Sequence, residues 1–427
     1  MGCAKNLIDS ELLYKQLDSN HYKISFDPAG IKGIDTVVIN TCGFIGAAKQ
    51  ESIDTILSYT DAKTRGDLKH VFVMGCLSER YREQLRTDIP EVDAFYGVNE
   101  LKLIVRDLGA TYNKHLLGER KISTPAHYAY LKIAEGCDRK CSFCAIPGIR
   151  GKHRSRPMAE ILSEARFLAD SGVKELIVIS QDTTYYGLDL YKRRKIANLL
   201  EQLSEIKNIE WIRLHYAFPD KFPPELLELI KSNPRICNYI DIPLQHISDR
   251  ILNSMRRGIS SAKSRRLIES IRQKVPEIFL RSSFILGYPG ETVKEFRELM
   301  EFVAETRFDR LGVFTYSHEE GTHAFSKKDS VSSAIKQARA DELMMLQEQI
   351  SLEKNKMKEG QTLKVLIDRY ENGYFIARSE GDSPEIDNEI LIAAAPGLLK
   401  TGTFIQATVT LAESFDLYAQ PAVLHDT

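Results

Sequence analysis

The stretch CDRKCSFC, residues 137–144, places three thiols close together in a chain of 427 residues that has seven cysteines in all. It follows AYLKIAEG, residues 129–136, whose apolar run is typical of a β-strand. A Cys-x3-Cys-x2-Cys loop in this place can bind zinc or an iron–sulfur cluster. A closed zinc site needs four ligands, and this loop supplies three. We therefore favour a four-iron cluster on Cys137, Cys141 and Cys144 that leaves one iron open to a substrate or cofactor.

Charged and aromatic residues lie between these thiols. Arg139 and Lys140 are expected to lower the pKa of the thiolates and to offset the charge of a ligated cluster. An ordinary solvated pair of surface cations would give the same sequence. Phe143 is expected to shield one side of the cluster or to stack on a bound base.

Strand-like and helix-like stretches alternate six times across residues 123–355. This alternation predicts a parallel sheet, built either as a doubly wound layer or as a partial (β/α)6 barrel. Polar or reactive residues follow the strands, and the carboxyl ends of such strands are where α/β enzymes place their chemistry. The expected strands are residues 129–137, 175–182, 209–218, 239–246, 279–290 and 310–318.

An N-terminal domain, residues 1–105, shows a second pattern of cysteines. The runs TVVIN, residues 36–40, and VFVMG, residues 71–75, are each followed by a cysteine and then by a helix-like stretch. A helix-like stretch also follows Cys3, but the strand before that cysteine is missing. Because parallel strands end at one edge of a sheet, this α/β domain could bring Cys3, Cys42 and Cys76 together. Each could instead be a small buried hydrophobic residue, which is the interpretation we give to Cys237.

The C-terminal segment, residues 358–427, contains short strand-like runs with turns and predicts a small antiparallel β-barrel. Residues 361–427 contain four basic and ten acidic residues, a net charge of −6. Such a module would repel RNA and attract a basic protein. A solvated acidic loop is the alternative interpretation of the cluster EGDSPEIDNE, residues 380–389.

Composition excludes several classes of protein. A net charge of −1, with 43% hydrophobic and 27% charged residues, is typical of a folded globular chain. The longest apolar run, residues 390–399, is too short to cross a bilayer, and MGCAKN lacks the hydroxyl residue of an N-terminal acylation motif. An odd number of cysteines and no leader-like start favour the reducing cytoplasm over secretion, so we expect no membrane partner.

The stretch CDRKCSFCAIP resembles the signature of the radical S-adenosylmethionine enzymes. With three further thiols in an α/β domain before it and a TRAM-like β-domain after it, the chain resembles the methylthiotransferases of that superfamily over nearly its whole length. Its motifs are similar to those of the ribosomal protein methylthiotransferases, in which a β-strand precedes the first Gly-Cys. We therefore expect either a start upstream of Met1 or a lost first strand. The motifs are GCAKNLIDSE, NTCGFI, GCLSERY, GIRGKHRSRP, SQDTTYYG, DIPLQH and GYPGET.

The resemblance implies two 4Fe-4S clusters. The catalytic cluster on Cys137, Cys141 and Cys144 would bind S-adenosylmethionine and cleave it reductively to a 5'-deoxyadenosyl radical. A second cluster on Cys3, Cys42 and Cys76 would handle the inserted sulfur. By the same resemblance, Gln181, Arg281 and Leu286 would lie on strands that line the cofactor pocket.

The activity implied is the addition of a methylthio group to the β-carbon of an aspartate in a basic small-subunit ribosomal protein. S-adenosylmethionine would serve as methyl donor and radical source, and a flavodoxin or ferredoxin would supply electrons. The basic segment RGKHRSR, residues 150–156, is expected to hold an acidic substrate side chain or the cofactor carboxylate. The alternatives are a transfer RNA adenosine methylthiotransferase, whose RNA the acidic C-terminal domain disfavours, and a two-cluster electron carrier without catalysis.

Overall fold

The computed structural model describes residues 2–26, 30–116, 118–395 and 397–422. The chain forms two compact units, each of which draws on several segments. The thiol unit contains both cysteine-rich regions that the sequence singles out. It comprises Met1–Thr124, Lys132–Phe167 and Ser317–Ser326, and the barrel unit comprises Pro125–Leu131, Leu168–Tyr316 and Lys327–Thr427.

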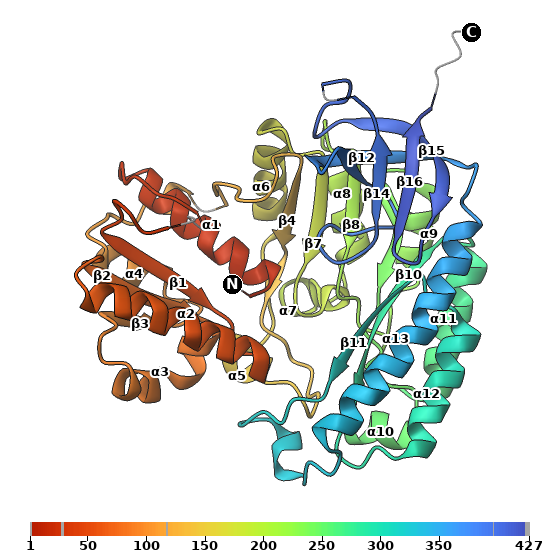
Figure 1. Ribbon diagram of the computed structural model, residues 1–427, viewed down its shortest axis with the longest axis horizontal. Helices are drawn as coiled ribbons and strands as arrows, with labels where there is room; N and C mark the ends of the chain where they lie inside the picture. Colours follow the sequence, from red (N-terminus) through yellow and green to blue (C-terminus); the bar gives the residue numbers. More distant parts are fainter. Residues whose placement is uncertain (1, 27–29, 117, 396, 423–427) are drawn as a thin grey trace. The chain divides into compact units, whose positions relative to one another are not determined.

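A three-stranded parallel sheet in the order β1-β2-β3 forms the N-terminal part of the thiol unit (Figure 1). Its strands are β1 (Thr36–Thr41), β2 (His70–Gly75) and β3 (Ala94–Tyr96). The helices are α1 (Ala4–Asp18), α2 (Gly46–Thr64), α3 (Cys76–Asp88) and α4 (Leu101–Asp107), with a 3-10 turn at Lys114–Leu116.

Alternating residues of β2 pack on opposite faces of this sheet. Val71 and Val73 lie in a buried cluster with residues of α2 and α3, whereas Phe72 and Met74 lie in a second cluster with residues of α1 and α4. This is the period-2 pattern of a strand that is covered on both faces. The helices therefore enclose the faces of the sheet and leave the carboxyl ends of its strands available for a site.

The remainder of the thiol unit surrounds the CDRKCSFC loop. Strand β5 (Ala134–Glu135) pairs antiparallel with β6 (Arg154–Ser155), and α5 (Ile146–Arg150) lies between them in sequence. Helix α6 (Met158–Asp170) begins in this unit, and a 3-10 turn, His323–Ser326, lies in its last segment.

Six strands form the sheet of the barrel unit in the order β4-β7-β8-β9-β10-β11. Neighbouring strands of this sheet are parallel wherever the register is defined, and their spatial order follows the chain. Successive parallel strands need helical crossovers, so this order is that of a partial β/α barrel. The strands are β4 (Tyr128–Lys132), β7 (Glu175–Ile179), β8 (Trp211–Leu214), β9 (Ile236–Asp241), β10 (Phe279–Leu286) and β11 (Arg310–Thr315).

Side-chain caps mark the start of the three longest helices of this unit. Thr292 and Glu295 form a capping box at α12, and the hydroxyls of Ser260 and Ser332 cap α11 and α13. The helices are α7 (Leu188–Tyr191), α8 (Ile196–Ser204), α9 (Glu225–Ser232), α10 (Asp249–Ser254), α11 (Ser261–Lys274), α12 (Val293–Thr306) and α13 (Ser333–Lys356), with a 3-10 turn at Thr183–Tyr185.

The C-terminal strands close into a five-stranded barrel in the order β12-β13-β14-β16-β15. Its pairs are antiparallel except β14 with β16, which is parallel, so the expected all-antiparallel barrel is modified at one seam. The strands are β12 (Thr362–Glu371), β13 (Tyr374–Ser379), β14 (Glu389–Ala393), β15 (Phe404–Ala412) and β16 (Asp416–Pro421).

The acidic loop between β13 and β14 is paired with residues of the β/α barrel. Asp382 is buried and accepts a hydrogen bond from Arg310 Nε at 2.9 Å. Asp387 accepts from Arg281 Nε at 3.2 Å and from the Tyr239 hydroxyl at 2.8 Å. These acids therefore contribute less to the outer field of the module than their count suggests, and neither of the two interpretations made from sequence foresees this internal pairing.

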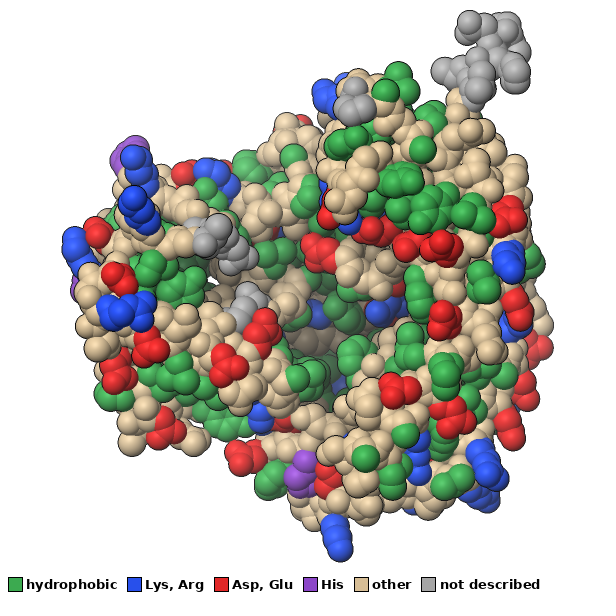
Figure 2. All heavy atoms as spheres, viewed as in Figure 1, with side chains coloured by type: hydrophobic (Ala, Val, Ile, Leu, Met, Phe, Trp, Pro, Cys, Tyr) green, Lys and Arg blue, Asp and Glu red, His purple; other side chains and the backbone are tan. Residues whose placement is uncertain are grey.

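The fold class predicted from sequence is confirmed: a parallel α/β sheet, a partial (β/α)6 barrel and a small C-terminal β-barrel. Within the described residues, no helix combines the length and apolar character needed to cross a membrane. Acidic and basic side chains are both spread over the face seen in Figure 2, in keeping with a net charge near zero.

Two arginines of the C-terminal barrel give a matched test of buried against exposed charge. Arg378 is buried and pairs with Glu175 and Asp368, whereas Arg369 pairs with Glu371 and Glu389 near the surface. We expect Arg378→Met to lower the free energy of unfolding by about 3 kcal/mol or more, because two buried carboxylates lose a cation. Arg369→Met should cost about 1 kcal/mol or less. Urea denaturation measures both, and equal costs would contradict the buried network.

Candidate functional site

The register of β1 and β2 brings Cys42 and Cys76 to one edge of the thiol unit's sheet. Thr41 lies opposite Gly75, and each is the last residue of its strand. The next residue in each segment is a cysteine, so the two thiols leave the sheet side by side. The Cys42 backbone is fixed from α2, because its N–H donates to Ser52 Oγ at 3.0 Å and its carbonyl accepts from the same hydroxyl.

Two glycines let these cysteine-bearing loops approach each other. Gly75 has a φ of +103°, and a Cβ atom there would lie 2.4 Å from Asn40 Oδ1 and 2.6 Å from the Thr41 carbonyl oxygen. A Cβ atom on Gly43 would lie 2.6 Å from Leu77 Cα. Only glycine fits such contacts, so the sequences TCG and GC specify the close packing of the two loops.

Cys3 joins the other two thiols through Asn6. Cys3 is the N-cap residue of α1, and Asn6 lies in the first turn of that helix. The buried Asn6 side chain donates from Nδ2 to the Thr41 carbonyl at 2.9 Å. Its Oδ1 accepts from Cys76 Sγ at 3.5 Å and faces Cys3 Sγ at 3.9 Å. One amide therefore brings the start of α1 to the sheet edge that carries the other two cysteines.

Arg150 lies beside this amide and is 1% exposed. Its Nη2 donates to Asn6 Oδ1 at 2.6 Å and to Asp9 Oδ2 at 3.1 Å, and lies 3.6 Å from Cys76 Sγ. Its Nη1 donates to both carboxylate oxygens of Glu135 at 3.1 Å. Lys132 binds the same two carboxylates, so two cations and two anions balance around the thiols.

Burial and charge act in opposite directions on these thiols. Burial raises the pKa of Cys76 to about 11 and that of Cys42 above its usual value, and the Arg150 charge lowers both. The three thiols are close enough that Cys3 also raises the pKa of the other two. Because Cys3 caps α1 and Cys76 is the first residue of α3, two helix N-termini favour negative charge at this place.

The CDRKCSFC loop is shaped by its own backbone. Cys137 Sγ accepts the Arg139 N–H at 3.4 Å, and the Cys144 N–H donates to the Cys141 carbonyl at 3.2 Å. Gly136, with a φ of +75°, lies where a Cβ atom would be 2.2 Å from the Lys152 carbonyl oxygen. The loop is therefore held against the segment after α5, and its thiols lie in half-buried positions. Phe143 is also half-buried.

The two groups of thiols are connected inside the thiol unit. Cys76 packs with Ala145 and Ile149, which follow the CDRKCSFC loop. The segment 317–326 is bound on both sides as well: Glu319 pairs with Arg80, which donates to the Gly43 carbonyl at 2.6 Å, and the Ala324 N–H donates to the Ser142 carbonyl at 2.6 Å.

Each group supplies three thiols, which matches a four-iron cluster with one open iron, whereas a closed zinc site needs four ligands. Thiolates on one zinc ion lie within about 4 Å of each other, since Zn–S bonds are about 2.3 Å long. In the described part of the chain, no three Cys, His, Asp or Glu side chains are arranged to hold a single metal ion. The Ser78 hydroxyl, in the first turn of α3, is buried and has no hydrogen-bond partner among the described residues.

The three residues expected to line the cofactor pocket lie in the barrel unit. Gln181 follows β7, while Arg281 and Leu286 lie on β10. Arg281 is held by Asp241 and Asp387, both at 3.2 Å. The regular register of β10 with β11 puts Arg281 and Leu286 on opposite faces of the strand, so their side chains cannot share one pocket face. Their cofactor contacts remain a prediction.

Sequence reasoning missed Asn6 and Asp9, placed Glu135 among the polar residues at the strand ends, and misassigned Arg150. The segment 150–156 was expected to hold an acidic substrate or the cofactor carboxylate, but Arg150 is buried against acids of its own unit. The position of Asn6 and Asp9 could have identified them, because they lie three residues apart on one face of α1, directly after Cys3. Cys237 is buried in the core as expected, and burial raises the pKa of its thiol to about 12.

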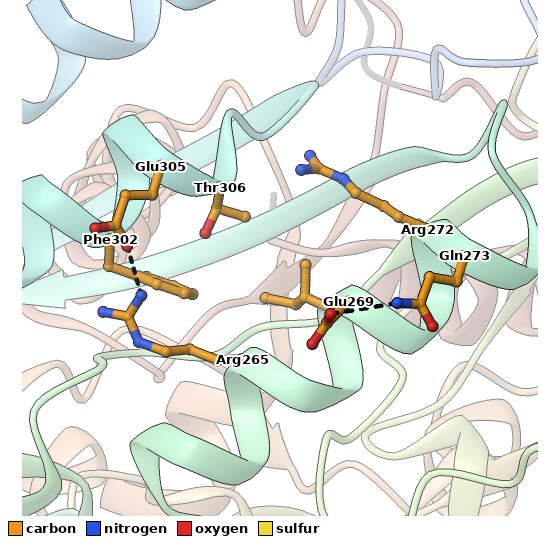
Figure 3. Close-up of a pocket in the computed structure, with 8 residues that line it drawn as sticks. Arg265, Glu269, Arg272, Gln273, Phe302, Glu305 and Thr306 are labelled. Atoms are coloured by element: carbon orange, nitrogen blue, oxygen red, sulfur yellow. Dashed lines mark hydrogen bonds and ion pairs between the residues drawn. The ribbon is translucent and has the colours of Figure 1, made fainter.

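A groove of about 470 Å³ between α11 and α12 contains none of the predicted site residues (Figure 3). Arg265 pairs with Glu305 across it at 2.6 Å, and Gln273 donates to Glu269 at 3.2 Å. Arg272 donates to the Arg307 carbonyl at 2.9 Å, and none of the described residues that line the groove is a cysteine.

Family models match three parts of the chain. The Radical SAM superfamily matches residues 131–303, the uncharacterized protein family UPF0004 matches residues 1–97, and the TRAM domain matches residues 360–421. The first model covers the CDRKCSFC loop, and the second covers all three N-terminal cysteines.

Curated relatives match nearly the whole chain. The ribosomal protein uS12 methylthiotransferase RimO of Flavobacterium johnsoniae is 54% identical over 422 residues, which are 99% of this chain and 97% of that protein. The protein of the same name from Bacteroides thetaiotaomicron is 52% identical over 98% of this chain and 96% of its own. That of Porphyromonas gingivalis strain ATCC 33277 is 51% identical over 98% and 97%.

Among solved structures, the radical S-adenosylmethionine methyltransferase TsrM of Kitasatospora setae is similar in fold. The structure with a tryptophan substrate and an S-adenosylmethionine analogue has a TM-score of 0.53 at 14% identity and covers 73% of this chain and 70% of that one. At this identity, the likeness concerns the fold alone.

Two glycines of the thiol unit separate backbone strain from packing. Gly66 has a φ of +84° with open space around its Cα, whereas Gly75 has a similar φ but no room for a side chain. We expect Gly66→Ala to cost about 1 kcal/mol of stability. Gly75→Ala should cost about 1–3 kcal/mol more, because the added methyl displaces Asn40 and Thr41. Denaturation of the metal-free protein measures both, and equal costs would contradict the close packing of the Cys42 and Cys76 loops.

Proposed function

The chain belongs to the family of ribosomal protein uS12 methylthiotransferases, and we propose that it adds a methylthio group to the β-carbon of an aspartate in that ribosomal protein. Membership of the family establishes a radical S-adenosylmethionine transferase with a 4Fe-4S cluster. The aspartate, the second cluster and the role of each cysteine are the parts that we propose.

We assign the catalytic cluster to Cys137, Cys141 and Cys144. When bound there with S-adenosylmethionine, it would supply the radical that removes a hydrogen atom from the β-carbon. The chain itself supplies the turn that presents three thiolates and a backbone N–H on Cys137 Sγ. Half-buried Phe143 would shield one side from water.

The convergence of Cys3, Cys42 and Cys76 on Asn6 and Arg150 is the observation that carries the proposal. A radical enzyme that only abstracts hydrogen needs one cluster. A second set of three thiols, in the same compact unit as the first, gives the inserted sulfur a binding place. Burial raises the pKa of Cys76 to about 11, and the thiol must lose its proton when it binds a cluster.

The substrate and the electron donor follow from charge and chemistry. We propose a basic small-subunit ribosomal protein as substrate, a flavodoxin or ferredoxin as donor, and the cytoplasm as the place of action. Several acids of the C-terminal module are paired inside the barrel unit, so attraction of a basic partner rests on its remaining exposed acids, such as Glu385 and Glu413.

The substrate is tested by incubating the anaerobically reconstituted protein with S-adenosylmethionine and dithionite. One reaction contains purified uS12 and a parallel one contains unmodified transfer RNA. We expect 5'-deoxyadenosine and one methylthio group on an aspartate-containing uS12 peptide, both seen by mass spectrometry. A methylthiolated nucleoside with an unchanged peptide would assign the chain to RNA instead, and the absence of 5'-deoxyadenosine would favour an electron carrier.

Iron analysis of two variants tests the two clusters. The reconstituted parent should contain about eight irons per chain, as two four-iron clusters require. Replacing Cys137, Cys141 and Cys144 by Ala should leave about four irons and abolish 5'-deoxyadenosine formation. Replacing Cys3, Cys42 and Cys76 by Ala should also leave about four irons, but 5'-deoxyadenosine formation should remain while methylthio transfer is lost. A full iron content in the second variant would contradict the assignment of those thiols.

A further inference from the structure

Arg150 is a buried cation whose side chain lies beside the N-terminal thiols, although in sequence it belongs to the helix that follows the CDRKCSFC loop. Because it is fully charged at any physiological pH, its burial requires partners on every side. Those partners are Asn6, Asp9 and Glu135.

The two terminal nitrogens of the Arg150 guanidinium have different hydrogen-bond partners. Nη1 is fully used by the two oxygens of Glu135, whereas Nη2 is shared between two oxygens and the sulfur of Cys76 at 3.6 Å. Lys132, Asp9 and Glu135 complete a set whose formal charges cancel with that of Arg150. No cation of this set is therefore left over to compensate a negative charge that is added at the thiols. The group of the set that faces such a charge is the Nη2–H of Arg150.

We propose that Arg150 is a positioning residue that sets the reduction potential of the second cluster by donating Nη2–H to the sulfur of Cys76. This inference rests on the proposed second cluster. When the cluster accepts an electron from dithionite, its negative charge grows and spreads onto the thiolate sulfurs. A hydrogen bond from a cation then becomes stronger, so it stabilises the reduced state more than the oxidised one. Loss of the bond should make the cluster harder to reduce.

Glu135 gives this role a structural basis. It holds the guanidinium through two parallel hydrogen bonds and lies two residues before Cys137. The orientation of the donor at Cys76 is therefore fixed by the same segment that leads into the catalytic loop. Arg150→Lys would keep the charge and lose this forked geometry, since an ammonium is a point charge without a planar fork.

The test is a redox titration on full-length protein in which Cys137, Cys141 and Cys144 are replaced by Ala, so that only the second cluster responds. Dithionite with mediators sets the potential, and electron paramagnetic resonance follows reduction. Arg150→Met should lower the ratio of reduced to oxidised cluster at a fixed potential at least about tenfold, equivalent to about 59 mV for one electron. Arg150→Lys should recover part of the shift.

Arg156→Met is the matched control. Arg156 lies on the same segment and pairs with Glu164 and the Lys132 carbonyl, so its loss removes one positive charge without removing the donor to Cys76. It should leave the potential unchanged. Arg150→Met also leaves two carboxylates with one cation, so Arg150→Met with Glu135→Gln, which keeps the charges balanced, is titrated beside it.

The possible outcomes distinguish a failure of this inference from a failure of the proposed second cluster. A lower potential in both Arg150→Met variants, with the Arg156→Met value at that of the parent, supports it. Equal potentials in all variants overturn it if each variant still holds the one four-iron cluster expected in this background. That result leaves the two-cluster proposal standing. Equal shifts in the Arg150→Met and Arg156→Met variants also overturn it, because net charge would then explain them. If the triple-Ala parent binds no iron, the second cluster itself is contradicted, and the inference falls with it.

Discussion

The arrangement of the thiols depends on satisfying one buried charge, the guanidinium of Arg150. A lone cation at 1% exposure would cost several kcal/mol, so the fold must supply anions and acceptors around it. It does so from separate segments, with Asn6 and Asp9 on α1 and Glu135 on β5. Meeting this requirement brings the first turn of α1, and with it Cys3, to the edge where Cys42 and Cys76 emerge. The same contacts therefore neutralise the cation and hold the start of α1 beside the other thiols.

The parallel sheet supplies the second constraint. Two strands in register end at Thr41 and Gly75, and glycines at positions 43 and 75 remove the side chains that would hold the following loops apart. Helices begin immediately afterwards, so the positive ends of α1 and α3 face the same place. Hydrogen bonds set the spacing of the thiols, and the helix N-termini and Arg150 set the electrostatics in favour of an anionic group.

Local patterns in the sequence predicted the strands, the alternation that makes a partial barrel, and the two groups of cysteines. Hydrophobic periodicity and the spacing of cysteines can be read directly along the chain. What sequence could not supply was pairing across the fold. The basic segment 150–156 was expected to bind an acidic substrate or the cofactor carboxylate because it follows the CDRKCSFC loop. Two partners of Arg150 instead lie more than a hundred residues away on α1, and the third, Glu135, precedes the loop. Counting charge in residues 361–427 likewise could not show that Asp382 and Asp387 are bound by Arg310 and Arg281. A charge count cannot distinguish a buried pair from a solvated side chain.

Anomalous diffraction at the iron edge, from crystals of the anaerobically reconstituted protein, tests the central claim most directly. Two iron centres are expected, one of them bonded to the sulfurs of Cys3, Cys42 and Cys76 with the Arg150 guanidinium against Cys76. A single iron centre confined to Cys137, Cys141 and Cys144 would contradict it, and so would a second centre bound by other residues.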